Sequence, residues 1–395
     1  METITLSEDH KWGKLAVVIV LVALGIFFLG RGIYAALNHQ GGWTEITAQY
    51  GTEGCGSSFQ FQYRLDDRSG NAEYHDLTLM YTSLCTREAK LYDSVGTYPD
   101  LGNLGALNAA PNQELSLEPE LYRALEKIQA SGNRVLYLAP LYEYYSCLFF
   151  CEREEETLAY DPLRNPDLAR SFGELAAFAS DPGQIDLELL GENRARLRVS
   201  EEYLAYAQAN GISLFVDFGW MKNAFILDDL AAAIRQKGFT RGYLLSTDGF
   251  GCNLCDTGES FSVNVFDRAL GEDCLAAQLQ YSRPLSFVSL RSYTTTPMGN
   301  DLYFELADGQ VRSIYVDPAD GMPKTAMDDL LLWSQERGCA DLVLMGSPIF
   351  TADSFAPERL EQLDCFYAYC SEKTLICSDP MMEISALAEG YRTAD

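Results

Sequence analysis

The chain is patterned mainly as short stretches in which hydrophobic and polar residues alternate, which is typical of β-strands. Residues 44–49 and 59–65 alternate in this way and are separated by glycine-rich turns, so they predict a hairpin region. A second hairpin is expected where 187–190 and 196–199 flank the turn Gly191-Glu192-Asn193. Further strands are predicted at 213–216, 243–246, 261–266, 286–290, 302–306, 312–316 and 374–377.

Helical spacing of hydrophobic residues is less common. It predicts helices over 118–129 and 225–237, each followed by a glycine that can end a helix, and a third helix over 358–369. The apolar runs 330–333 and 340–350 suit either a strand or a buried helix. Many strands and few helices favour an α+β class, with mixed sheets and flanking helices.

Two polar stretches are expected to be irregular. Residues 76–110 contain the loop-like sequence YPDLGNLGALN, and 152–185 are acidic and proline-rich, which indicates surface helix and loop.

One apolar run is long enough to cross a membrane. Residues 15–30 contain no charge, and beyond Arg31 the apolar stretch continues to residue 37; a spanning helix needs about 20 such residues. Lys11 and Lys14 precede the run, which favours an inside N-terminus and a main domain outside the cell membrane. A cleaved signal peptide is the alternative, although Tyr34-Ala35-Ala36 is a poor cleavage site.

These features divide the chain into an anchor and one large external domain. The predicted parts are a cytoplasmic tail over 1–14, a transmembrane or signal-anchor segment over 15–37, the external domain over 41–380 and a C-terminal tail over 381–395.

The composition restricts the chemistry. The formal charge of −28 argues against nucleic acid as a partner, because a phosphate backbone is bound by lysine and arginine. All three histidines lie at or before residue 75, so most of the chain lacks an imidazole for catalysis or zinc binding. The eleven cysteines include close pairs at 147/151, 252/255 and 365/370, for which disulfides, a metal site and free thiols all stay open.

Four segments combine polar side chains with glycine or with a helix start. They are 216–224 at a predicted strand-to-helix junction, 246–251 after a strand, 316–323 with Asp-Pro and Asp-Gly, and 339–341 before an apolar run. A free helix N-terminus and a close glycine backbone can hold an anion. Each segment can equally be a turn or a helix cap.

In their order and spacing, these segments resemble the FAD:protein FMN transferases, the ApbE-like family. VDFGWMKNAFILD at 216–228 is similar to the family's VDLGGIAKGYAVD, and GQVRSIYVDPADGMP at 309–323 is similar to its G-(x)4-HxxDPxTGxP pattern. ADLVLM at 340–345 looks like its ADALST helix, and Tyr50-Gly51-Thr52 looks like its MGT. The resemblance implies a fold related to the T-fold.

The resemblance also implies site residues. Nucleotide contacts are expected at Tyr50, Asp217, Gly219, Lys222, Asn223, Asp248, Gly249, Ile314 and Asp317. A Mg²⁺ ion is expected at the carbonyl of Trp220, at Asp341 and at Met345.

Three of these positions depart from the family pattern. Asn223 stands in place of a lysine, Ile314 in place of a histidine, and Met345 in place of a threonine. A thioether is a poor ligand for a hard cation. Each lost catalytic group typically costs about 10²–10⁴-fold in rate.

Three functions therefore stay open. The first is the activity that the resemblance implies: Mg²⁺-dependent transfer of FMN from FAD to a threonine of an acceptor protein, which could itself be a membrane protein. The second is a non-catalytic relative that binds a flavin nucleotide or a partner protein. The third is a structural surface protein whose polar segments are turns and caps.

Overall fold

The structure is a computed structural model, and it describes residues 41–49, 54–66, 70–254, 258–269, 272–294 and 302–394. The predicted tail 1–14, the predicted membrane segment 15–37 and Tyr50 lie outside these residues. Among the residues that are described, no helix is both long and apolar enough to cross a membrane.

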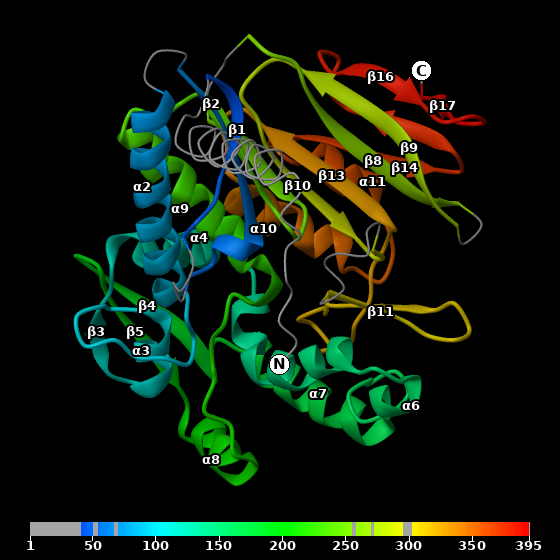
Figure 1. Cartoon of the computed structure of the whole chain (residues 1–395). Helices are drawn as coiled ribbons and strands as arrows, with labels where there is room; N and C mark the ends of the chain where they lie inside the picture. The colour runs from blue at the N-terminus through cyan, green and yellow to red at the C-terminus, as the bar shows by residue number, and fades with distance from the viewer. Residues whose placement is uncertain are drawn as a thin grey trace, which may run out of the picture.

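A nine-stranded sheet forms the centre of the fold (Figure 1). Neighbouring strands are antiparallel, except that the last pair, β15 and β17, is parallel. In spatial order the strands are β1 (Gly42–Ile46), β2 (Phe59–Leu65), β6 (Gly242–Ser246), β7 (Phe250–Asn253), β10 (Ser286–Arg291), β13 (Asp329–Ser334), β14 (Phe366–Ser371), β15 (Thr374–Cys377) and β17 (Arg392–Thr393).

Smaller sheets complete the β-structure. One contains β16 (Glu383–Leu387), β9 (Glu272–Tyr281) and β8 (Phe261–Ala269), and a second contains β3 (Glu114–Ser116), β5 (Arg194–Val199) and β4 (Ile185–Gly191). A two-stranded ribbon is formed by β11 (Tyr303–Glu305) and β12 (Val311–Ser313). Residues 381–395, assigned from the sequence to a tail, thus contribute β16 and β17; the domain boundaries themselves stay a prediction.

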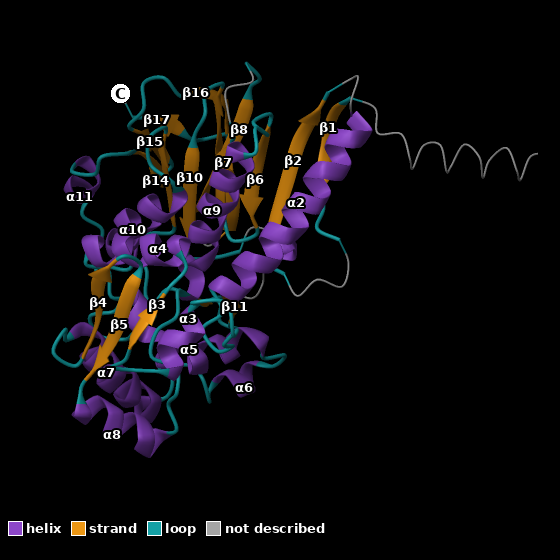
Figure 2. Cartoon of the chain, turned by 90° about the vertical axis from the view of Figure 1, so that its left-hand side faces the viewer, coloured by secondary structure: helices purple, strands orange, loops and turns teal. Residues whose placement is uncertain are grey.

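Helices lie on one face of the large sheet and below it (Figure 2). The α-helices are α2 (Gly70–Leu91), α3 (Leu104–Ala109), α4 (Pro119–Ser131), α5 (Ala139–Tyr145), α6 (Glu154–Thr157), α7 (Pro166–Ser180), α8 (Glu201–Asn210), α9 (Lys222–Gln236), α10 (Cys339–Phe350) and α11 (Pro357–Glu361). Short 3₁₀ turns are η1 (Gly56–Ser58), η2 (Val135–Leu138), η3 (Ser146–Phe150) and η4 (Gly219–Met221).

The large sheet is covered on both faces. Helices α2, α9 and α10 pack on one face, whereas β8 lies against β13 and β14 on the other. Consequently β13 is buried at all six positions, and Leu331 and Trp333 belong to a second apolar core shared with the small sheet. This explains why its sequence suits a strand and a buried helix equally well.

Several sequence predictions are confirmed. The hairpins β1–β2 and β4–β5 are present, and the second turns through Glu192 and Asn193, which both have positive φ as a two-residue hairpin turn requires. Helix α4 buries Leu121, Leu125 and Ile128 and ends at Gly132 with φ +68°. Of the two ambiguous runs, 330–333 is a strand and 340–350 is a helix.

Other predictions are wrong. Much of the stretch expected to be loop-rich, 76–110, is helical, because α2 runs to Leu91. The helix expected over 358–369 ends at Glu361, and Phe366–Ser371 instead pairs with β13 and β15 as β14. Residues 213–216 form no strand, and a side chain instead satisfies backbone groups of Phe215 and Val216, as described below.

Candidate functional site

A pocket of about 390 Å³ lies beside the N-terminal end of α9, and we call it the central pocket. Its lining comes from separate segments of the chain: Val95, residues 139–150, residues 214–223, Asp248, and Leu302 with Ile314. The volume falls within the range of about 300–1,000 Å³ that is usual for small-molecule sites. Seven of the positions predicted from the sequence line it: Asp217, Gly219, Trp220, Lys222, Asn223, Asp248 and Ile314.

The segment that leads into the pocket is held by the buried side chain of Asn108. Its Oδ1 accepts hydrogen bonds from the backbone N–H groups of Phe215 and Val216, both at 2.9 Å, and its Nδ2 donates to the Val216 carbonyl at 2.9 Å. These bonds supply Phe215 and Val216 with the partners that a neighbouring strand would otherwise provide. Asp217 is thereby placed at the pocket wall.

Asp217 and Gly219 form the turn into α9. The Gly219 N–H donates to Asp217 Oδ1 at 2.5 Å, and Gly219 has φ +54°, a conformation that favours glycine. Directly after it, the buried Trp220 donates from Nε1 to the Tyr142 hydroxyl at 3.1 Å and packs edge-on against Tyr315. One wall of the pocket is therefore a fixed aromatic surface.

Asn223 and Asp248 join the two segments across the pocket. Asn223 Nδ2 donates to Asp248 Oδ2 at 2.9 Å, whereas Asp248 Oδ1 is buried and has no hydrogen-bond partner among the described residues. Burial raises the pKa of Asp248 to about 6, although the side chains of Ser246 and Asn223 and the charge of Lys222 oppose this shift. The pocket thus contains a carboxylate that can accept or donate a further hydrogen bond near neutral pH.

Lys222 supplies positive charge to the pocket. Within the described part of the chain its ammonium group takes part in no hydrogen bond or ion pair, and it lies at the first residue of α9, directly after the 3₁₀ turn η4, where its backbone N–H donates to the Gly219 carbonyl. An ammonium group beside a helix N-terminus favours an anionic ligand. The nearby carboxylates of Asp217 and Asp248 limit how much anionic charge the pocket can hold.

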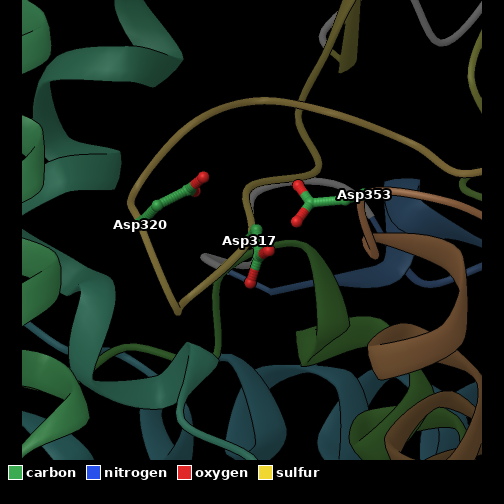
Figure 3. A group of neighbouring side chains, drawn as sticks. All are labelled: Asp317, Asp320 and Asp353. Carbon is green, nitrogen blue, oxygen red and sulfur yellow. The ribbon is translucent and has the colours of Figure 1, made fainter.

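Asp317 does not line the central pocket but a separate one of about 430 Å³, which is also lined by Asp353. Asp317, Asp320 and Asp353 point their carboxylates toward one region, and we call these three residues the acidic corner (Figure 3). One oxygen from each lies within 4.8 Å of the others, which is the arrangement of a cation site.

The acidic corner already contains a positive charge from the chain. Lys324 Nζ lies 2.8 Å from Asp317 and 2.9 Å from Asp320, and it also pairs with Asp353. These carboxylates raise the pKa of Lys324 despite its partial burial, so the ammonium stays charged. A metal ion would have to displace it.

The two side chains assigned to a metal lie elsewhere. Asp341 is in the first turn of α10 and pairs with Lys127 at 2.8 Å, and Met345 follows one turn later; neither lines the central pocket, as far as the described residues define it. The first turn of α10 is capped by Asp228, whose carboxylate accepts from the N–H groups of Cys339 and Ala340. Asp228 is six residues along α9 from Lys222, or about 9 Å of helix.

Gly249 has a structural explanation. Its φ is +100°, and a Cβ there would lie 2.8 Å from the carbonyl oxygen of Ser289 on β10. The glycine is required for close packing of two strands. Whether it also contacts a nucleotide stays a prediction, as do the roles of the other proposed site residues.

Sequence reasoning missed part of the pocket wall. Tyr142, Glu143 and Ser146 come from α5 and η3, and Val95 and Phe150 form an exposed apolar rim, with 78% and 69% of their surface accessible. No local pattern distinguishes these residues from other aromatic or acidic positions. Val95 and Phe150 can be recognised only in the folded structure, by the large fraction of their apolar surface that stays exposed.

Comparison with known structures shows an ApbE-like fold. An ApbE protein from Thermotoga maritima superposes with a TM-score of 0.58 at 12% identity, over 87% of this chain and 97% of the other. Flavin transferase ApbE from Vibrio cholerae gives 0.56 at 8% identity, over 88% and 98%, and Pseudomonas stutzeri flavinyl transferase ApbE gives 0.52 at 12%, over 89% and 96%. No protein-family profile and no curated protein sequence matches the chain. The predicted mixed α+β fold of this type is therefore confirmed.

Proposed function

We propose that this protein binds a flavin nucleotide in the central pocket. The observation that carries the proposal is the convergence there of residues from 216–224, 246–251 and 309–323, the segments that resemble flavin transferases. The solved structures with this fold include proteins described as flavin transferases. At such low identity they support the fold, and the pocket residues support the ligand.

The lining suits a planar aromatic ring that carries phosphate. Tyr142, Trp220 and the apolar rim of Val95 and Phe150 offer surface for a ring system, and Lys222 offers an unpaired ammonium for a phosphate group. The volume of about 390 Å³ is near the lower end for ligand pockets. We therefore expect the flavin mononucleotide half to be enclosed and any adenosine half to lie outside.

The residues do not fit a resident Mg²⁺ ion at the position that the resemblance implies. The Asp341 carboxylate is neutralised by Lys127, and the Met345 thioether is unsuited to a hard cation. The acidic corner offers oxygen ligands, but Lys324 occupies it. No chemical step is assigned to a metal here.

FMN transfer is the second candidate function, and the free ammonium of Lys222 favours it. In that reaction an acceptor hydroxyl attacks the FMN phosphorus of FAD, the bond to the AMP oxygen breaks, and AMP leaves. Lys222 would stabilise the charge that develops on the phosphate oxygens. Ile314, which is 6% exposed at the pocket wall, provides no group that could move a proton.

The two candidates are separated by one experiment on the full chain. Binding alone predicts that FMN and FAD raise the melting temperature, that ADP does so less, and that no AMP appears when FAD, Mg²⁺ and an acceptor protein are added. AMP release together with a flavin-labelled acceptor band would establish transfer. A melting temperature that is indifferent to all three nucleotides would contradict both.

We also propose, from the apolar run at 15–37, that the chain is attached to the cell membrane with its N-terminus inside. Full-length protein should fractionate with membranes, and protease added outside intact cells should digest the main domain. A variant lacking 15–37 should be released. Recovery of the full-length chain in the aqueous fraction would contradict the proposal.

A further inference from the structure

Two cysteines lie where the segment before β2 contacts helix α2. They are 30 residues apart, so the spacing of cysteines in the sequence does not indicate the pair. Cys55 immediately precedes η1, and Cys85 is fully buried on α2. The Cys55 N–H donates to the Cys85 carbonyl at 3.2 Å, and the Cys55 thiol donates to the same oxygen at 3.3 Å. The backbones of the two cysteines are therefore in direct contact.

The surroundings hold the two side chains together. A Cβ added at Gly56 would lie 2.7 Å from the Cβ of Ala48 and 3.7 Å from the Sγ of Cys85, so the space beside the sulfur is tightly limited. A Cβ added at Gly54 would lie 3.2–3.3 Å from the backbone of Cys85 and Thr86. Two glycines thus allow the chain around Cys55 to approach α2 closely enough for the hydrogen bonds to the Cys85 carbonyl.

We propose that Cys55 and Cys85 form a reversible disulfide that fastens helix α2 to the β1–β2 hairpin. The inference is independent of the proposed flavin site. Cysteines can be bridged when their Cα atoms lie within about 4.4–6.8 Å and their side chains face each other, and a direct backbone hydrogen bond between the two residues is compatible with this range.

The two thiols differ in a way that suits stepwise oxidation. Cys55 is partly exposed, whereas Cys85 is not. The hydrogen bond with Cys85 raises the pKa of Cys55, and the same interaction lowers the pKa of Cys85. Only Cys55 is open to a small oxidant from solvent, so it is the thiol that reacts first and Cys85 the one that resolves the bond.

The oxidant is a low-molecular-weight disulfide. The Cys55 sulfur attacks it and forms a mixed disulfide, the bond between the two small-thiol sulfurs breaks, and the Cys55 proton goes to the small thiol that leaves. The Cys85 sulfur then attacks the Cys55 sulfur, the mixed disulfide breaks, and the Cys85 proton goes to the second small thiol, which leaves. In total, two protein thiols lose two protons and two electrons, and the small disulfide gains them.

A bond between Cys55 and Cys85 would also restrain the surroundings of α9, whose N-terminal end lies beside the central pocket. Helix α2 packs on β1, β2 and α9, and directly after it the Tyr92 hydroxyl donates to Asp229 of α9 at 2.7 Å. A covalent bond at Cys85 therefore restrains a helix that packs beside α9. We expect the oxidised protein to melt about 5 °C higher than the reduced protein.

The test uses the full chain equilibrated with oxidised glutathione, followed by alkylation of free thiols under denaturing conditions, proteolysis and mass spectrometry. The expected result is a peptide pair joined through Cys55 and Cys85 that disappears after reduction. Recovery of both residues as alkylated thiols, while the exposed Cys147 carries glutathione, would overturn the proposal. So would a persistent glutathione adduct at Cys55, or a bond from either residue to another cysteine.

Two variants serve as controls. Cys55→Ser, at a partly exposed position, should fold and should lose both the linked peptides and the rise in melting temperature on oxidation. Cys147→Ser removes an exposed thiol that only donates to the Glu143 carbonyl, and it should retain both. An equal response of the two variants to oxidation would count against the Cys55–Cys85 bond.

Discussion

The central pocket and the acidic corner contain the same kinds of charged group in opposite arrangements. In the acidic corner, the ammonium of Lys324 lies among three carboxylates that it neutralises. In the central pocket, the ammonium of Lys222 acts on Asp93 and Asp248 only at a distance and forms no ion pair in the described part of the chain, and one buried carboxylate oxygen, Asp248 Oδ1, is unpaired. The first region is complete without a ligand, and the second is not.

The difference shows that a group of acidic residues is insufficient evidence for a metal site. Carboxylates that converge must be neutralised, because their mutual repulsion is unfavourable, and a chain can supply the cation itself. Lys127 does the same for Asp341. Ligand binding is better inferred from polar groups that the fold leaves without partners.

The largest effect is expected when the lysine of the acidic corner is replaced. Lys324→Met should lower the free energy of unfolding by about 2 kcal/mol without divalent cations, since three carboxylates then repel one another. Exposure of Asp320 and Asp353 keeps the loss below that of a fully buried pair. Urea unfolding with and without Ca²⁺ measures the effect.

Ca²⁺ should restore the stability of Lys324→Met and leave that of the unchanged protein almost constant. A comparable Ca²⁺-dependent stabilisation of the unchanged protein would show that its acidic corner is a metal site after all.

Removing the corresponding charge from the central pocket should change binding instead of stability. Lys222→Met should raise the Kd for FMN about tenfold, because the phosphate loses its cationic partner. Lys237→Met, an exposed position after the last turn of α9, is the matched control and should leave the Kd unchanged. Equal affinities for both variants in a fluorescence titration would remove Lys222 from the site.

The backbone of the pocket can be tested at Gly219. A Cβ there meets nothing closer than the Tyr142 ring at 3.7 Å, so the cost of Gly219→Ala arises from its φ of +54°. We expect a loss of about 1 kcal/mol of stability and a weaker flavin site. Gly173→Ala, within α7 and with nothing near its Cβ, should not destabilise the protein in the same urea experiment.

The smallest expected effect is a pH dependence from Asp248. Because burial raises its pKa to about 6, the side chain is mostly neutral below pH 6 and charged above it. FAD, whose diphosphate does not change charge in this range, should bind about threefold more tightly at pH 5 than at pH 7.5. Titrations at constant ionic strength should show this trend, and Asp248→Asn should abolish it.

A pH-independent affinity in the unchanged protein, or an equal trend in Asp248→Asn, would exclude Asp248 as the titrating group.

Local pattern predicted the elements that have one buried face. Strand β2 alternates between buried and exposed residues, and α4 has a single apolar stripe that ends at a glycine. Helix α2 was missed because its buried positions include Thr78, Cys85 and Glu88 as well as apolar residues, so its periodicity is weak in the sequence. Tertiary packing, not local preference, determines this helix.

The candidate site was predictable to the extent that it lies within contiguous segments. Asp217, Gly219 and Lys222 follow one another at a helix start, and their proximity is a local property. The pairing of Lys127 with Asp341 joins residues that are 214 positions apart and determines whether that carboxylate is available. Nothing in either local sequence indicates it.

The most direct test of the account is a titration of FMN fluorescence with the full-length protein. The account predicts saturable quenching at one site per chain, with binding that weakens about tenfold in Lys222→Met and is unchanged in Lys237→Met. Fluorescence that stays constant up to millimolar protein, or quenching that both variants share equally, would contradict the central claim that the pocket at the start of α9 binds a flavin nucleotide.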